Sequence, residues 1–201
     1  MTKLVYIAGQ SAIPGRVELG AGESLDMTVI VLPGVSCSIP LRFDLLGEGA
    51  ELQLCGLYLC NGTQKVDITV EVRHEVGGCT SRQQFLGIAG GEAEASFFGK
   101  IFVRQDAQKT KAYQENHNIL TSVAATVETR PQLEIYADDV ECSHGATVGS
   151  LNEDERFYMR SRGIPEGEAR VLQMISFISP VAGHIEDESL REEIYDKLSQ
   201  C

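Results

Sequence analysis

A cysteine and a histidine stand two residues apart in the segment Cys142-Ser143-His144. In an extended backbone, side chains at positions i and i+2 point to the same side, so this thiol and this imidazole face one partner or one metal. Thiolate and imidazole both bind iron and zinc. Because a closed tetrahedral site needs four ligands, two interpretations stay open: a site completed by another chain, or a turn that holds no metal.

The other cysteines and histidines offer less chemistry. The six cysteines stand at positions 37, 55, 60, 79, 142 and 201, without any Cys-x-x-Cys pair or zinc-finger spacing. We expect Cys55 and Cys60 to be inert core thiols, because their surroundings are apolar and strand-like. His74 is expected to be a satisfied surface or edge group, and His117 and His184 are expected to be exposed in loop-like segments.

Motifs of common catalytic sites are missing from the sequence. It contains no Gly-x-x-x-x-Gly-Lys-Ser/Thr loop for nucleotide phosphates and no Gly-x-Ser-x-Gly elbow. Asp138 and Asp139 are adjacent and point to opposite faces of a strand, which argues against a glycosidase pair. We therefore expect a protein that is not an enzyme.

Composition limits the class of partner. The 201 residues carry a net charge of −12, with 43% hydrophobic and 23% charged residues, which is typical of a globular chain. Such an acidic surface repels phosphate backbones, so no nucleic acid is expected, whereas a basic protein partner is attracted. The sequence shows no signal peptide and no run of ~18 apolar residues, so we expect a cytoplasmic protein without a membrane segment.

Strand patterns dominate the chain between residues 25 and 140. Apolar side chains alternate there in several short runs that Gly and Asn clusters separate. Related segments begin at Gly22, Gly47 and Gly90, offsets of 25 and 43 residues, which correspond to about one and two coils of a solenoid. A β-sandwich with Asn61-Gly62 as a hairpin turn explains the same strands, so the pattern alone leaves both architectures open.

Helical signals begin after Gly149. Asn152 is a candidate cap for a first helix that Gly163 ends, and Pro165 begins a second helix that Pro180 stops. A third helix starts near Asp187, and its apolar stripe consists of Leu190, Ile194 and Leu198. The sequence therefore predicts a β region over residues 1–150 and a helical region over residues 151–201.

Several ordered motifs carry a family resemblance. The segment Cys142-Ser143-His144-Gly145-Ala146-Thr147-Val148-Gly149, with acidic residues before it and Phe157-Tyr158 and Ser161-Arg162-Gly163-Ile164 after it, resembles the C-terminal signature of the SufB/SufD family. These proteins are scaffold components of the SUF iron–sulfur cluster assembly machinery, and the His-Gly-Ala-Thr-Val-Gly form is similar to the SufD branch. Further matching segments lie upstream, at residues 79–82, 98–103, 107–110 and 131–135.

The resemblance implies a mainly β fold, a right-handed parallel β-helix (solenoid) with C-terminal α-helices. It extends from about Leu52 to the C-terminus. Family members are longer, so the resemblance implies a short, truncated form without the N-terminal helical region. Residues 1–20 or a second chain are then expected to cover the first strands.

The resemblance also implies a function. Cys142 and His144 are expected to ligate a transient iron–sulfur cluster at a subunit interface, with a SufB-like scaffold subunit or a second copy as partner. A symmetric dimer with Cys142 near its two-fold axis brings two such pairs together. The C-terminal helices are expected to dock a SufC-like ATPase through the stripe of the last helix; a second interpretation, that this stripe packs on the chain's own solenoid, stays open, and both hold if different faces serve each role. The alternative is a purely structural, partner-binding protein without a metal site. A third interpretation is a β-helix enzyme that acts on polysaccharides, but such an enzyme needs a secretion signal and the sequence shows none.

Overall fold

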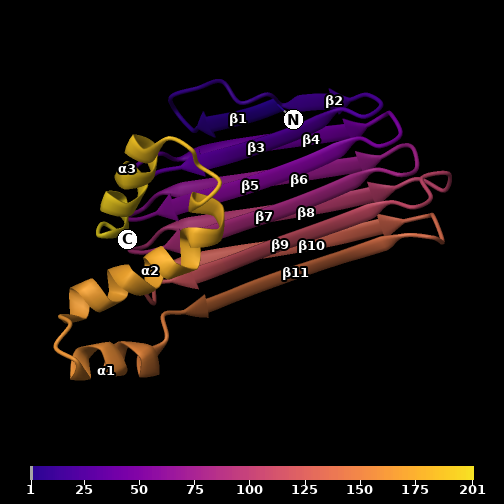
Figure 1. The fold of residues 1–201 in the computed structure, drawn as a ribbon. Coiled ribbons are helices and arrows are strands. Elements are labelled where there is room, and N and C mark those ends of the chain that lie inside the picture. Colours follow the sequence, from indigo (N-terminus) through magenta and orange to yellow (C-terminus); the bar gives the residue numbers. More distant parts are fainter. Residues whose placement is uncertain (1) are drawn as a thin grey trace.

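The computed structural model describes residues 2–201, in which two sheets of strands are followed by three helices (Figure 1). The first sheet, in spatial order, contains β1 (Thr2–Ile7), β3 (Ser24–Val31), β5 (Glu51–Cys60), β7 (Thr80–Ala89), β9 (Lys111–Leu120) and β11 (Glu141–Ser150). The second sheet contains β10 (Thr126–Ile135), β8 (Glu94–Val103), β6 (Lys65–His74), β4 (Cys37–Leu45) and β2 (Arg16–Leu19).

These sheets form a β-helix. Successive strands alternate between the two sheets, and the strand pairings within each sheet are parallel. One coil takes about 30 residues, since Glu51 pairs with Thr80 and Lys111 pairs with Glu141. Asn61-Gly62 lies at the corner between β5 and β6, where Gly62 has a φ of +64°. The solenoid expectation is confirmed, and the sandwich with a hairpin at this turn is excluded.

The internal repeat was partly misread from the sequence. Leu25 pairs with Leu52, so this coil is 27 residues rather than 25. The segments at Gly47 and Gly90 precede β5 and β8, which belong to opposite sheets. Their offset of 43 residues is therefore about one and a half coils, where the sequence pattern predicted two.

The space between the sheets, which we call the lumen, holds the main core. Alternate residues of each strand point into it, and large apolar side chains fill the coils from β3 to β8. Phe85 and Phe97 meet there with ring centroids 4.8 Å apart. Residues 2–20 supply β1 and β2, which pair with β3 and β4 and so cover them; Met1 lies outside the described residues.

Toward β11 the lumen becomes polar. The amide Nδ2 of Asn116 donates to the Tyr58 hydroxyl at 3.0 Å, and Asn118 Nδ2 donates to Asn116 Oδ1 at 2.8 Å. Gln114 Nε2 donates to Gln83 Oε1 at 2.8 Å. All of these side chains are buried. Hydrogen bonding between them offsets the cost of placing amides in an interior, which is large for an unpartnered group.

The helices follow the last strand. They are α1 (Glu153–Ser161), α2 (Glu166–Ala182) and α3 (Glu188–Leu198). Asn152 Oδ1 accepts the Asp154 amide at 2.9 Å and so caps α1, as expected, and Asp187 caps α3. Gly163 adopts a φ of +88° just after α1. The strands end at Ser150, but a division of the chain into two domains at this point stays a prediction.

The expectation that Pro180 stops the second helix is wrong. Proline has no amide hydrogen, so the carbonyl of Ser176 loses its usual helical donor. The Ser179 hydroxyl donates to that carbonyl at 2.9 Å instead, and α2 continues to Ala182. Val181 and Ala182 are fully buried, so packing also favours the continuation.

Helices α2 and α3 cover part of the outer face of the first sheet, at the C-terminal halves of β3, β5 and β7 (Figure 1). Apolar side chains from both layers form a second core: Ile30, Leu57, Leu59, Leu86 and Ile88 of the sheet with Met174, Ile178, Ile194 and Leu198 of the helices. The apolar stripe of α3 therefore packs against this chain's own sheet, where Ile194 and Leu198 are fully buried. It does not present the free docking surface that the sequence suggested. Among residues 2–201, no helix has both the length and the apolar content needed to cross a bilayer.

This second core predicts unequal effects along α2. We expect Ile178→Ala to lower the free energy of unfolding by about 2–5 kcal/mol, because Ile178 is fully buried between helix and sheet. Leu172→Ala, at a side chain that is 46% exposed on the same helix, should change it by less than about 0.5 kcal/mol. Urea denaturation of both variants measures this, and equal losses would contradict the packing described.

Candidate functional site: an exposed ligand pair and a helix groove

Cys142 and His144 lie on β11, the last strand of the first sheet (Figure 1). β11 pairs with β9 so that Cys142 stands beside Ala112 and His144 beside Gln114. Ala112 and Gln114 are both buried in the row of β9 that points into the lumen. Cys142 and His144 therefore share the lumen-facing row of β11, as the i, i+2 spacing predicted. No further strand follows β11 in its sheet, so this row lies at the open end of the lumen.

The two side chains differ in environment. Cys142 is half-buried and packs against a small apolar cluster that includes Val103, Ala112 and Ala137. Burial raises the pKa of the Cys142 thiol, and hydrogen bonding to the backbone of Ala112 lowers it less. The thiol is thus protonated at neutral pH, and a metal must displace that proton to bind. His144 is exposed.

Cys142 and His144 are not part of a larger cluster of metal-binding side chains. In the part of the chain that the structure describes, no three His, Cys, Asp or Glu side chains gather closely enough to hold a metal ion. Cys142 and His144 alone supply two of the four ligands that a closed tetrahedral site needs. The donor types suit iron, because thiolate and imidazole are both iron–sulfur ligands.

Contacts on the outer face fix β11 against β9. Glu141 accepts the Tyr113 hydroxyl at 3.1 Å and pairs with Lys111 at 3.0 Å. A ring nitrogen of His117 lies 2.9 Å from the Thr147 hydroxyl. His117 is therefore a partly exposed side chain on a strand, which corrects the loop expected from the sequence. His184 is exposed, as expected.

His74 is a core residue, which corrects its expected place at the surface. It occupies the lumen-facing row of β6 and is fully buried. Its Nε2 lies 2.9 Å from the Ser81 hydroxyl, and its Nδ1 has no partner among the described residues. Burial lowers the pKa of His74 to about 4. Cys55 and Cys60 are fully buried, as expected, and Cys79 is fully buried as well.

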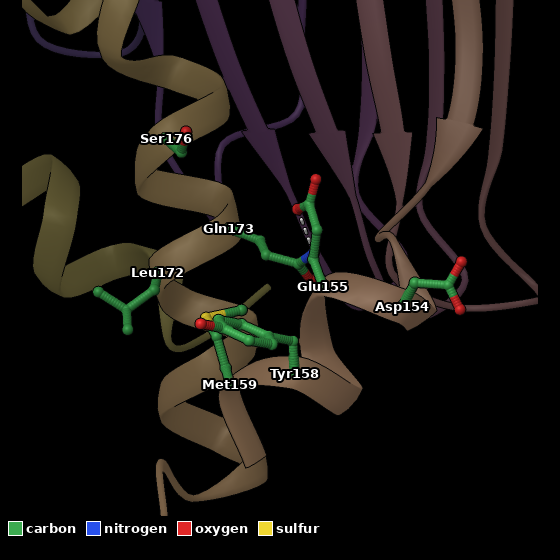
Figure 2. Close-up of a pocket in the computed structure, with 7 residues that line it drawn as sticks. All are labelled: Asp154, Glu155, Tyr158, Met159, Leu172, Gln173 and Ser176. Atoms are coloured by element: carbon green, nitrogen blue, oxygen red, sulfur yellow. Dashed lines mark hydrogen bonds between the residues drawn. The ribbon is translucent and has the colours of Figure 1, made fainter. Parts of the chain in front are cut away.

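A groove between α1 and α2 was missed from the sequence. Figure 2 shows Tyr158 and Met159 of α1 facing Leu172, Gln173 and Ser176 of α2 across it. The groove has a volume of about 510 Å³. Gln173 Nε2 donates to Glu155 Oε2 at 2.9 Å and holds the two helices together.

The apolar lining of this groove is open to solvent. Tyr158 is 59% exposed and its neighbour Phe157 is 72% exposed. Exposed aromatic side chains beside a groove are typical of protein interaction sites. Two adjacent aromatic residues, Phe157 and Tyr158, in an otherwise charged helix are the sequence feature that could have predicted this surface.

The fold is a β-helix whose last strand presents Cys142 and His144 at its open end. The family model described as "SUF system FeS cluster assembly, SufBD core domain" matches residues 15–177. The chain belongs to this SufBD family. The match begins well before Leu52, where the sequence resemblance was expected to begin, and it includes Cys142 and His144 but not α3.

Curated relatives agree with the family. The chain is 38% identical over 156 residues to the iron–sulfur cluster assembly protein SufD of Escherichia coli, covering 78% of this chain and 37% of SufD. It is also 38% identical over 156 residues to the SufBD family protein slr0076 of Synechocystis, covering 77% of this chain and 33% of that protein. Protein ABCI7, chloroplastic, of Arabidopsis thaliana is 34% identical over 149 residues, covering 74% of this chain and 31% of that protein. The chain spans about a third of the length of these relatives.

The burial of His74 predicts a pH-dependent stability. Between pH 6.5 and about 4, unfolded His74 binds a proton that folded His74 excludes, so the free energy of unfolding falls as the pH is lowered. We expect this contribution to reach about 1.4 kcal/mol per pH unit. His74→Leu should remove it, whereas the exposed control His184→Leu should keep the wild-type slope. Urea midpoints from pH 7.5 to 4.5 measure the slopes; identical slopes for wild type and His74→Leu would show the assignment to be wrong.

Proposed function

We propose that this chain is a scaffold component of SUF-type iron–sulfur cluster assembly, in which Cys142 and His144 supply ligands to a transient cluster at a subunit interface. The observation that carries this is their shared lumen-facing row on the terminal strand β11. The cluster is cargo of such a scaffold. Membership of the SufBD family supports the general role.

The partner meets the chain at the open end of the β-helix. The outer edge of β11 carries backbone groups free for pairing with another strand, and edge strands readily accept such a partner. A SufB-like subunit or a second copy placed there brings its own ligands beside Cys142 and His144. Two copies related by a two-fold axis supply two thiols and two imidazoles, which is enough for four-coordinate binding.

A SufC-like ATPase is the second proposed partner, and the groove between α1 and α2 is its docking surface. Ile194 and Leu198 of the α3 stripe are buried, whereas Tyr158 and Leu172 in the groove, and Phe157 next to Tyr158 on α1, are exposed. Asp154 and Glu155 line the same groove and favour a partner with a basic rim around an apolar contact. Docking there leaves the covered sheet undisturbed.

A purely structural, partner-binding role is the alternative, and one observation favours it. Burial raises the pKa of the Cys142 thiol, which favours an uncoordinated thiol over a thiolate ligand. In this alternative β11 still pairs with a partner, but no cluster forms.

Anaerobic reconstitution separates these functions. With iron and sulfide, the wild-type dimer, or its complex with a SufB-like chain, should develop visible charge-transfer absorption. His144→Ala should reduce that absorption while leaving the fold intact, because the imidazole is exposed and contributes little to packing. His184→Ala, at another exposed histidine, is the matched control and should keep the wild-type signal.

Equal iron content in wild type and His144→Ala, or no iron in either, would leave the structural role as the better explanation. Light scattering across micromolar concentrations tests the interface separately. A monomer at all concentrations, with no complex formed with a SufB-like chain, would contradict pairing at the open end.

The docking surface predicts a local effect of charge. Leu172→Asp should weaken binding of a SufC-like ATPase by at least about tenfold, because an unpaired carboxylate then sits in an apolar contact. Val123→Asp, at a fully exposed side chain on the turn before β10, should leave binding unchanged. Calorimetric titration measures both affinities, and an unaltered affinity for Leu172→Asp would exclude the groove as the docking surface.

A further inference from the structure

We propose that Gln114 is a positioning residue for His144. Its side-chain oxygen accepts a hydrogen bond from one ring nitrogen of the imidazole, so that the other ring nitrogen presents its lone pair to iron. This inference rests on the ligand role proposed for His144, and it names a residue of the lumen that supports that role.

Gln83, Gln114 and His144 form one column along the lumen. They occupy the same lumen-facing position on β7, β9 and β11, since Gln83 pairs with Gln114 and Gln114 pairs with His144. Adjacent strands of a sheet lie about 4.8 Å apart, so side chains in register within one row are neighbours. The first two members of the column are in direct contact, because Gln114 Nε2 donates to Gln83 Oε1 at 2.8 Å.

Gln114 is left with one free acceptor. The side chain is only 1% exposed, and its Oε1 has no hydrogen-bond partner among residues 2–201. Buried amide groups normally have partners, and in this pair Gln83 Nε2 and Gln114 Oε1 both lack one; Gln114 is the member of the pair that stands beside β11. The imidazole of His144 is the next polar side chain in the column, and its N–H is the group that fits.

The opposite sheet holds Gln114 in place. Gly99 of β8 lies directly across the lumen, and a Cβ added there would stand 2.5 Å from both Nε2 and Oε1 of Gln114. The absence of a side chain at Gly99 is therefore what admits the amide. Gly99 on the opposite sheet and Gln83 on β7 therefore fix the position of the Gln114 amide, without any contribution from His144.

The chemistry follows from the two nitrogens of a neutral imidazole. One carries hydrogen and donates, and the other carries a lone pair and binds metal. Metal-binding histidines commonly donate the second N–H to a carbonyl or carboxylate, which fixes both the tautomer and the ring orientation. The amide oxygen of Gln114 does this without adding charge to a site that already receives a thiolate.

Nitrogen-15 NMR of the histidine rings tests the proposal in the free protein. In the wild type, His144 should be held largely in one tautomer, whereas the exposed His184 should show the ordinary mixture. The double variant Gln83→Met/Gln114→Met replaces both bonded amides with apolar side chains of similar size, which leaves no amide stranded in the lumen. In this double variant, His144 should show the same mixture of the two imidazole tautomers as His184. Gln114→Glu keeps an acceptor and should keep the single tautomer.

Binding of ferrous iron alone, under anaerobic conditions, gives a second readout. The double variant should bind about tenfold more weakly than wild type, and Gln114→Glu should restore most of that loss. Circular dichroism confirms the fold of each variant; if the double variant is unfolded, Gln114→Met alone takes its place in both measurements.

The outcomes separate this inference from the function on which it rests. A His144 tautomer that is the same in wild type and in the apolar variant overturns the role of Gln114, whatever the iron affinity. A tautomer that changes, together with equal iron binding by wild type and His144→Ala, supports the hydrogen bond and refutes the ligand role. A tautomer and an affinity that change together support both.

Discussion

Parallel pairing of one coil on the next is the constraint on which this molecule depends. Each strand from β3 to β9 obtains its backbone partners from the coils on either side, so the ladder is complete only in the interior of the stack. The last coil lacks a neighbour on one side. Its edge and its lumen-facing row, which carries Cys142 and His144, are uncovered for the same reason.

The alternation of side chains along each strand then decides what every residue can do. It places His74 and Gln114 inside the lumen and Cys142 and His144 at its mouth, while Glu141 and His117 bind on the outer face. An inward position in a complete coil excludes water and lowers the pKa of His74. A corresponding position in the last coil leaves His144 exposed. Both histidines lie on strands, so the difference in their exposure comes from the position of the coil in the stack: His74 lies in an interior coil and His144 in the last one.

Much of the fold follows from the sequence where hydrophobic alternation is strong, as in β3, β5 and β6. Strand β9 gives no such signal, because its inward residues Gln114, Asn116 and Asn118 are polar and are satisfied mainly by neighbouring coils. The choice between solenoid and sandwich needed the family resemblance, since both bury alternate residues. Coil-to-coil contacts also explain the errors: the burial of His74 and of the α3 stripe depends on residues remote in sequence. That Cys142 and His144 share one face of a strand depends only on their i, i+2 spacing, so it could be predicted from the sequence.

The change from an apolar to a polar lumen has a consequence for how the molecule opens. In a stack of coils, stability is close to a sum of each coil's own contribution and the contacts with its neighbours. The large apolar side chains of the lumen lie in the coils from β3 to β8, whereas in the last coil His144 stands beside the amide of Gln114, Cys142 stands beside the small side chain of Ala112, and no further strand pairs with β11. Amide hydrogen exchange should therefore begin at the ligand-bearing end and spread inward. If a subunit pairs with β11 as proposed, it takes the place of the missing neighbour, and its binding then orders Cys142 and His144 in the same cooperative step.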